Sequence, residues 1–174
     1  MKRRTLLSLG VLGATVLAVT GGALALIQPA RRNETFSEPA KLMLAAVARA
    51  VLADLMPTEG DAGAKAMQEL QQRLQTTISG MPAAMQAEVD ELLTIVSSAP
   101  GRRALVGLSE PWETAPTSEV AAALQDMRNS SLALRQQAFH ALRDLTNAAY
   151  FADPGAWAAI GYPGPRELNA GATA

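Results

Sequence analysis

The chain has 174 residues, of which 49% are apolar, and it contains no cysteine. This length fits one globular domain that can bury most of its apolar surface without a metal or a disulfide. The absence of cysteine excludes disulfides, thiolate zinc sites, iron–sulfur clusters and covalent attachment of c-type haem.

The charges are distributed unevenly between the N-terminus and the rest of the chain. The 15 basic and 16 acidic side chains give a net charge of −1, but five of the basic ones fall within residues 1–32. Residues 33–174 therefore hold 10 basic against 16 acidic side chains, a net charge of −6. Most of the non-specific affinity for nucleic acid comes from Lys and Arg on phosphates, so we expect no nucleic-acid partner.

Residues 1–32 have the layout of an export signal. A basic head over 1–4 precedes an uncharged, apolar run over 5–27, and Ala23 and Ala25 provide the small residues of a cleavage site. About 20 apolar residues suffice to cross a bilayer, so retention as a membrane anchor stays open beside cleavage after Ala25. We expect a periplasmic protein, or one anchored in the inner membrane and facing the periplasm.

The basic head resembles a twin-arginine signal. Arg3 and Arg4 are followed closely by Leu6 and Leu7, and Lys2 stands where that signal usually has Ser or Thr. The twin-arginine translocase exports folded proteins, which suits a subunit that leaves the cell with a cofactor-loaded partner. An ordinary secretory signal is the alternative.

Residues 33–165 read as amphipathic helices separated by Pro and Gly, without strand-like alternation or internal repeats, and 166–174 read as a flexible tail. This pattern predicts an all-α domain, a compact bundle of five to six helices behind the signal or anchor helix. The expected segments are a central helix over 37–56 capped by Ser37, a helix over 61–80 capped by Asp61, a helix from Pro82 to about residue 100, a connecting loop over 101–116, a helix over 118–127, a longer helix ending near 151, and a short helical turn from Asp153-Pro154 to Ile160.

Two of these helices are predicted to have a solvent-exposed polar face. The helix over 61–80 has polar residues on one side: Gln68, Glu69, Gln71, Gln72 and Arg73. The next helix is expected to turn Met85, Val89, Leu92 and Val96 inward. Its acidic residues Glu88, Asp90 and Glu91 are interpreted as a solvated face, in preference to a general acid and base.

His140 is the only histidine, so a Ser-His-Asp arrangement cannot form without it. Asp144 lies one helical turn further on as a possible orienting carboxylate. We interpret His140 as a solvated helix residue, in preference to a haem or metal ligand. No glycine-rich phosphate loop is present. The sequence therefore predicts no catalytic, cofactor-binding or metal-binding residue in this chain.

Five of the seven aromatic residues fall in the last quarter of the chain: Phe139, Tyr150, Phe151, Trp157 and Tyr162. They could close one end of the hydrophobic core, since large rings close small helical domains well. Alternatively, Tyr150, Phe151, Trp157 and Tyr162 could form a partner-binding patch with Pro163, because rigid Trp and Tyr side chains serve as interface anchors. Both interpretations stay open.

Two stretches together resemble a known family. Residues 52–64 read L-A-D-L-M-P-T-E-G-D-A-G-A, and residues 145–165 read L-T-N-A-A-Y-F-A-D-P-G-A-W-A-A-I-G-Y-P-G-P. They are similar to the "ADxLxP" turn and the closing "Y…DP…W…GYPGP" motif of the gluconate 2-dehydrogenase subunit 3 family. The resemblance covers residues 40–165.

The resemblance implies a non-catalytic small subunit of a periplasmic or membrane-bound dehydrogenase. The large subunit would be a flavoprotein of the glucose–methanol–choline type that carries FAD and oxidises a sugar, a sugar acid or an alcohol. A cytochrome subunit with haem c would pass the electrons on. By this analogy Arg3 and Arg4 provide the export signal for the partner, and residues 153–165 are a family signature without a catalytic role. The alternative is a membrane-anchored periplasmic scaffold or chaperone unrelated to a dehydrogenase.

Overall fold

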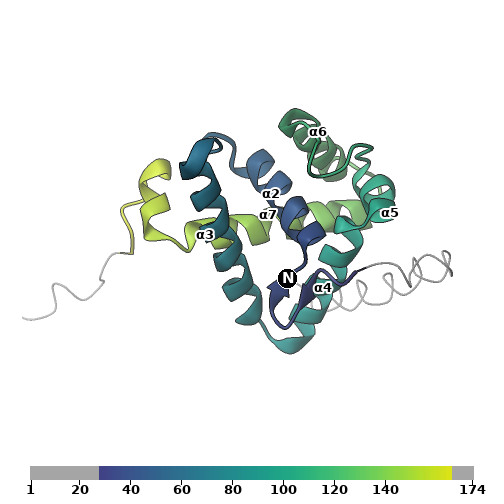
Figure 1. Ribbon diagram of the computed structural model, residues 1–174, viewed down its shortest axis with the longest axis horizontal. Helices are drawn as coiled ribbons and strands as arrows, with labels where there is room; N and C mark the ends of the chain where they lie inside the picture. The colour runs from purple at the N-terminus through teal and green to yellow at the C-terminus, as the bar shows by residue number, and fades with distance from the viewer. Residues whose placement is uncertain (1–27, 166–174) are drawn as a thin grey trace, which may run out of the picture.

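A computed structural model describes residues 28–165, apart from the side chain of Asp54, and helices predominate in it (Figure 1). In chain order the elements are β1 (Arg31–Arg32), β2 (Thr35–Phe36), α2 (Glu38–Leu52), η2 (Ala53–Leu55), α3 (Gly60–Ser79), α4 (Ala83–Ser97), α5 (Ala99–Gly101), η3 (Arg102–Val106), α6 (Thr117–Arg128), α7 (Ala133–Phe151) and η4 (Pro154–Ile160). The all-α prediction is confirmed. The predicted signal or anchor helix lies outside the described residues.

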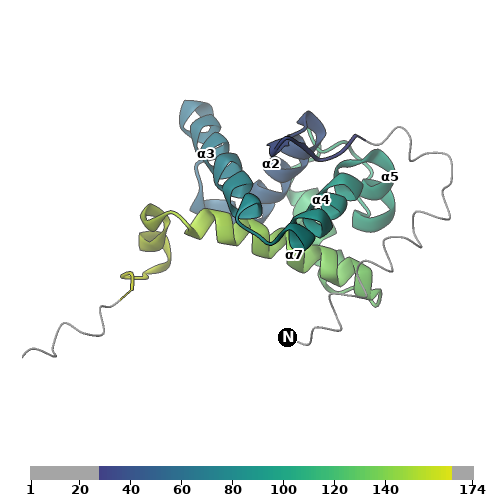
Figure 2. The same ribbon diagram turned by 90° about the horizontal axis from the view of Figure 1, so that it is seen from below.

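Helix α2 is the central element, as its two apolar sides predicted. Most of its length is buried, through Ala40, Met43, Leu44, Ala45, Ala46, Val47, Ala48 and Leu52. It packs against α3, α4, α6 and α7. Figure 2 shows α7 along one side of the domain, and α3 packs against it. The core therefore lies between α2 and α7 and is closed by the surrounding helices.

Proline and glycine mark most of the predicted helix boundaries correctly. Pro82 is the N-cap of α4, and Gly80 is the C-cap of α3. Ser37 occupies the N-cap position of α2, but its hydroxyl has no hydrogen-bond partner among the described residues. The predicted cap Asp61 lies instead inside the first turn of α3, whose N-cap is Glu59. A carboxylate in that turn still complements the helix dipole.

The prediction of a loop over 101–116 is wrong for residues 101–106, where α5 and η3 continue the helical structure. Gly101 permits this fold, because a Cβ there would lie 1.9 Å from the carbonyl oxygen of Ile95. The buried Arg102 guanidinium then donates to Leu108 O at 3.3 Å and Ser109 O at 3.1 Å. These partners lie six and seven residues away in the chain, a spacing that neither the Gly and Pro signals nor the i, i+4 pattern of an α-helix covers, so the sequence pattern did not reveal the helical turns.

The predicted wet faces are partly corrected by the structure. Gln71 donates to the Lys41 carbonyl at 3.1 Å, and Arg73 contacts the end of α7, so neither simply faces water. Asp90 forms an ion pair with Arg31 at 2.7 Å, which corrects its assignment to a solvated face. Met85 is 43% exposed although we expected it inward. Leu93 takes a core position in α4 instead.

The short hairpin β1–β2 is an addition that the sequence pattern did not predict. Its strands pair antiparallel, with Arg31 opposite Phe36. Asn33 and Glu34 between them both have positive φ, as a tight two-residue hairpin turn requires. The boundary predicted between residues 32 and 33 falls inside this hairpin.

Among the described residues, no helix is long and apolar enough to cross a membrane.

Candidate functional site

The segment over 52–64 forms the turn that joins α2 to α3. Ala53 ends α2 with a φ of 35°, an unusual conformation for a residue with a side chain, and its N–H donates to Arg49 O. The start of α3 then lies very close to the preceding loop, because a Cβ on Gly63 would lie 2.6 Å from the carbonyl carbon of Thr58. A glycine at this position is therefore required by the packing of the turn.

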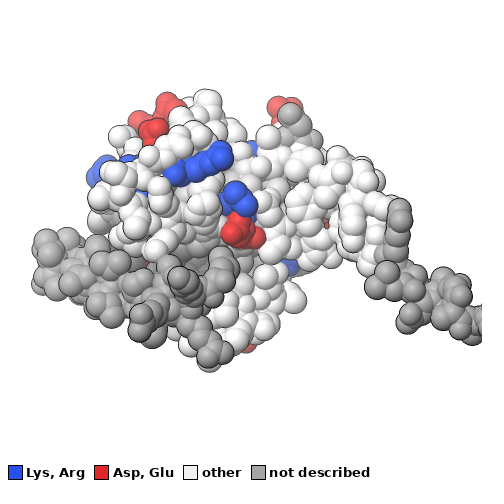
Figure 3. Space-filling model, turned by 180° about the vertical axis from the view of Figure 1, so that it is seen from behind, with Lys and Arg blue, Asp and Glu red and all other residues white. Residues whose placement is uncertain are grey.

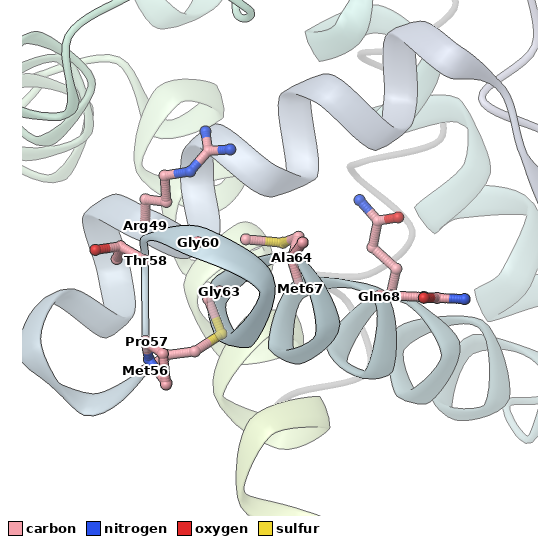
Figure 4. A pocket seen from close by; sticks show the side chains of 10 residues that line it. Arg49, Met56, Pro57, Thr58, Gly60, Gly63, Ala64, Met67 and Gln68 are labelled. Carbon is pink, nitrogen blue, oxygen red and sulfur yellow. The ribbon is translucent and has the colours of Figure 1, made fainter.

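A pocket of about 360 Å³ lies beside this turn (Figure 4). It is lined by Arg49, Met56, Pro57, Thr58, Gly60, Gly63, Ala64, Met67, Gln68 and Gln71. Figure 4 shows the thioethers of Met56 and Met67 on opposite sides of the first turns of α3. Methionine side chains adapt to varied apolar groups. The lining therefore combines these two apolar side chains with the polar side chains of Arg49, Gln68 and Gln71.

The closing segment over 145–165 forms the end of α7 and the turn η4. Asp153 caps η4 by accepting the Gly155 N–H at 2.9 Å, with Pro154 in the first turn. Gly161 ends η4 in the left-handed conformation, with a φ of 67°. The predicted start of this turn at Asp153-Pro154 is confirmed.

Trp157 is the centre of this closing segment. Its indole N–H donates to Phe151 O at 2.8 Å, and its ring meets that of Tyr162 edge-on at 5.3 Å between centroids. Gly164, with a φ of 93°, lies against the indole, where a Cβ would be 3.2 Å from the ring. The G-Y-P-G-P sequence thus folds back over Trp157.

The two motif segments meet at one end of the molecule. The Tyr150 hydroxyl donates to the Leu55 carbonyl oxygen of η2. Arg73 of α3 adds a second link, because its Nε donates to Ala149 O at 3.1 Å and its Nη1 lies 3.7 Å from Asp153 Oδ2. Segments almost one hundred residues apart therefore form one structural unit. We call residues 52–64 and 145–165 together the motif end.

The aromatic residues of the predicted patch occupy different depths. Tyr150 is 8% exposed and belongs to the core, while Phe151 is half-buried and meets the Tyr150 ring edge-on at 5.1 Å. Trp157 is half-buried, and Tyr162 and Pro163 are exposed. The core-closing interpretation therefore describes Tyr150. Partner binding stays a prediction for the less buried residues Trp157, Tyr162 and Pro163.

His140 lies on the exposed side of α7, as predicted. Its ring meets that of Phe139 edge-on at 5.2 Å. Asp144 contacts Arg143 Nε at 3.0 Å, so the idea that it orients His140 finds no support. Over residues 28–165, no group of three or more His, Asp or Glu side chains could hold a metal ion.

Other predicted site residues lie outside the described part of the chain. These are Arg3, Arg4, Leu6 and Leu7 of the export signal, and Ala23 and Ala25 of the cleavage site. Conversely, Arg73 was missed as a link between α3 and the closing segment. In the sequence, Arg73 stands on the polar side of its helix like any solvent-exposed residue. Only the fold shows that it contacts Ala149 and Asp153.

Comparison with known proteins adds no relative: no protein-family model, no curated protein and no solved structure matches this chain.

Proposed function

We propose that this chain is the non-catalytic small subunit and export escort of a periplasmic flavin-dependent dehydrogenase that oxidises a sugar, a sugar acid or an alcohol. FAD and haem c belong to the partner subunits in this proposal. The twin-arginine translocase exports the assembled pair, and the chain works in the periplasm or at the periplasmic face of the inner membrane. The family resemblance of residues 52–64 and 145–165 is the source of the proposal.

The observation that carries the proposal is the meeting of those two segments at the motif end. Two motifs that resemble the same family are joined by the Tyr150 hydroxyl and the Leu55 carbonyl, and Arg73 of the neighbouring α3 contacts Asp153 of the second motif. Such a unit can present one surface to a partner. Seen from behind, the part of the molecule that carries η4 shows few charged side chains (Figure 3).

The exposed side chains of the motif end are suited to protein contact. Ile160 is 53% exposed and Tyr162 46% exposed, and residues 154–165 contain no charged side chain. Interfaces are depleted of charge at their centre and enriched in Tyr and Trp. The half-buried Trp157 beneath Tyr162 would make the surface rigid, which lowers the entropy lost on binding.

The docking part of the proposal is tested with Trp157→Ala. The variant should reduce co-purification of a flavoprotein about tenfold or more, the loss expected when an aromatic anchor is removed from an interface. Capture is measured by pull-down from the native membrane fraction, with a flavin absorbance scan and mass spectrometry. A lower melting temperature with undiminished capture by the folded molecules would contradict docking through the motif end.

The escort part is tested by replacing Arg3 and Arg4 with Lys. Both this chain and the flavoprotein should then stay in the cytoplasm, as shown by fractionation and immunoblotting. Arg32→Lys is the matched control, since it changes a second arginine pair outside the signal head. A flavoprotein that still reaches the periplasm in the double variant would exclude the escort role and favour a scaffold or chaperone unrelated to a dehydrogenase.

A further inference from the structure

The pocket beside the turn between α2 and α3 is lined by residues that differ in their exposure to solvent. Met56 is 6% exposed, and Gly63 is buried as well. Arg49, Thr58 and Gln68, in contrast, are exposed. A ligand in this pocket would therefore meet an apolar group where the lining is buried and polar groups where the lining reaches solvent.

Arg49 gives the pocket a positive charge. Of the ten described residues that line the pocket, Arg49 is charged and none is acidic. Its guanidinium forms no ion pair with any side chain that the structure describes. Figure 4 shows this guanidinium on the same side of the first turns of α3 as the Met67 thioether. The charge is therefore available to an anionic group that enters the pocket.

The amide of Gln71 fixes one wall of the pocket. Its Nε2 donates to the Lys41 carbonyl oxygen at 3.1 Å, so the side chain is held between α3 and α2. A wall that is already in place does not have to be ordered when a ligand binds, and the entropy lost on binding is smaller. The pocket is thus partly formed in advance.

The volume and the charge of the pocket limit the kind of ligand. A volume of about 360 Å³ is near the lower end for ligand pockets and, at about 30 Å³ for each water molecule in the liquid, holds roughly ten non-hydrogen atoms. One guanidinium matches one carboxylate, which it can bind through two parallel hydrogen bonds. A phosphate dianion would leave negative charge uncompensated, in a chain whose residues 33–174 already carry a net charge of −6.

We infer that this pocket binds a small monocarboxylate with a short apolar chain. The carboxylate pairs with the Arg49 guanidinium, and the apolar chain lies against Met56 and Met67, whose flexible thioether side chains adapt to its shape. The binding is reversible and forms no covalent bond. This inference goes beyond the proposed function and needs no dehydrogenase subunit.

The test uses the full-length chain in a non-ionic detergent, with isotope-labelled methionine methyl groups observed by NMR and hexanoate as the probe. The signals of Met56 and Met67 should shift and saturate with a Kd of about 1 mM, as expected for a ligand of this size. The Met85 signal should stay in place, because Met85 is exposed on α4 and does not line the pocket. Hexanamide, which has the same chain without the charge, should bind about tenfold more weakly. Acetate, which lacks the chain, should also bind more weakly.

Two arginine variants locate the charge that binds the carboxylate. Arg49→Gln should weaken hexanoate binding about tenfold and leave hexanamide binding unchanged. Arg128→Gln is the matched control, because Arg128 is exposed in the last turn of α6 and does not line the pocket. Equal affinities for hexanoate and hexanamide, equal losses in the two variants, or no saturable shift at Met56 and Met67 would each overturn the inference. Failure of the dehydrogenase proposal is distinguishable, since that is read from flavoprotein capture.

Discussion

Residues 30–37, which we call the N-terminal latch because Ala30 and Phe36 are buried in the core, differ from the motif end in how they are attached to the helical domain. The latch buries a charged side chain, Arg31, and pairs it with Asp90. Around η4 the motif end uses aromatic rings and uncharged turns instead, and it leaves Ile160 and Tyr162 exposed. The comparison therefore shows internal attachment through an ion pair at one end and exposed uncharged side chains at the other. Contact of the exposed side chains with a partner remains a prediction.

The largest effect on stability is expected at Gly101, where α5 lies against α4. Gly101→Ala would place a Cβ 1.9 Å from Ile95 O, which forces α5 away from α4. We expect a loss of about 3 kcal/mol or more in the free energy of unfolding, measured by urea denaturation.

Gly161→Ala is the matched control at the motif end. Gly161 has a φ of 67°, and no atom lies within 4 Å of the position that an added methyl group would take. Its substitution should cost only about 1 kcal/mol, from backbone strain alone. Equal losses at the two glycines would contradict the close approach of α5 to α4.

The next largest effect concerns the charge of the latch. Asp90→Asn should lower the free energy of unfolding by about 2 kcal/mol, because Arg31 loses its counter-charge in a buried position. A double-mutant cycle with Arg31→Met measures the coupling between the two side chains. Coupling below about 0.5 kcal/mol would mean that the pair behaves like an ordinary surface ion pair.

A smaller loss is expected where the two motifs meet. Tyr150→Phe removes the hydroxyl that donates to Leu55 O and leaves that carbonyl without this partner. The free energy of unfolding should fall by about 1 kcal/mol, measured by thermal and urea denaturation. An unchanged value would show that the contact between η2 and α7 depends on packing alone.

The smallest effect on stability is expected at Tyr162, where the ring is 46% exposed. Tyr162→Ala should change the free energy of unfolding by less than about 0.5 kcal/mol while weakening capture of a flavoprotein in the pull-down. Leu132→Ala is the matched control, because Leu132 is 62% exposed at the opposite end of α7. Equal capture by both variants would contradict external contact at the motif end.

Much of the fold was predictable because it depends on local signals. The central position of α2 followed from its two apolar sides, and Gly80, Pro82 and Asp153 mark boundaries through their own backbone preferences. The continuation of helical structure through α5 and η3 was not predictable. It depends on Gly101 meeting the Ile95 carbonyl and on the hydrogen bonds of Arg102, which are contacts outside the regular i, i+4 spacing of an α-helix.

For the candidate site, the sequence by itself determined where the two family-like segments lie and that their turns require Pro, Gly and Asp. That the two segments meet through Tyr150 and Leu55, that Arg73 attaches α3 to the second one, and that Arg31 belongs to the folded domain follow from the three-dimensional arrangement. The physical reason is that propensity and periodicity act over one or two helical turns, whereas these partners are brought together by the burial of apolar surface between α2 and α7.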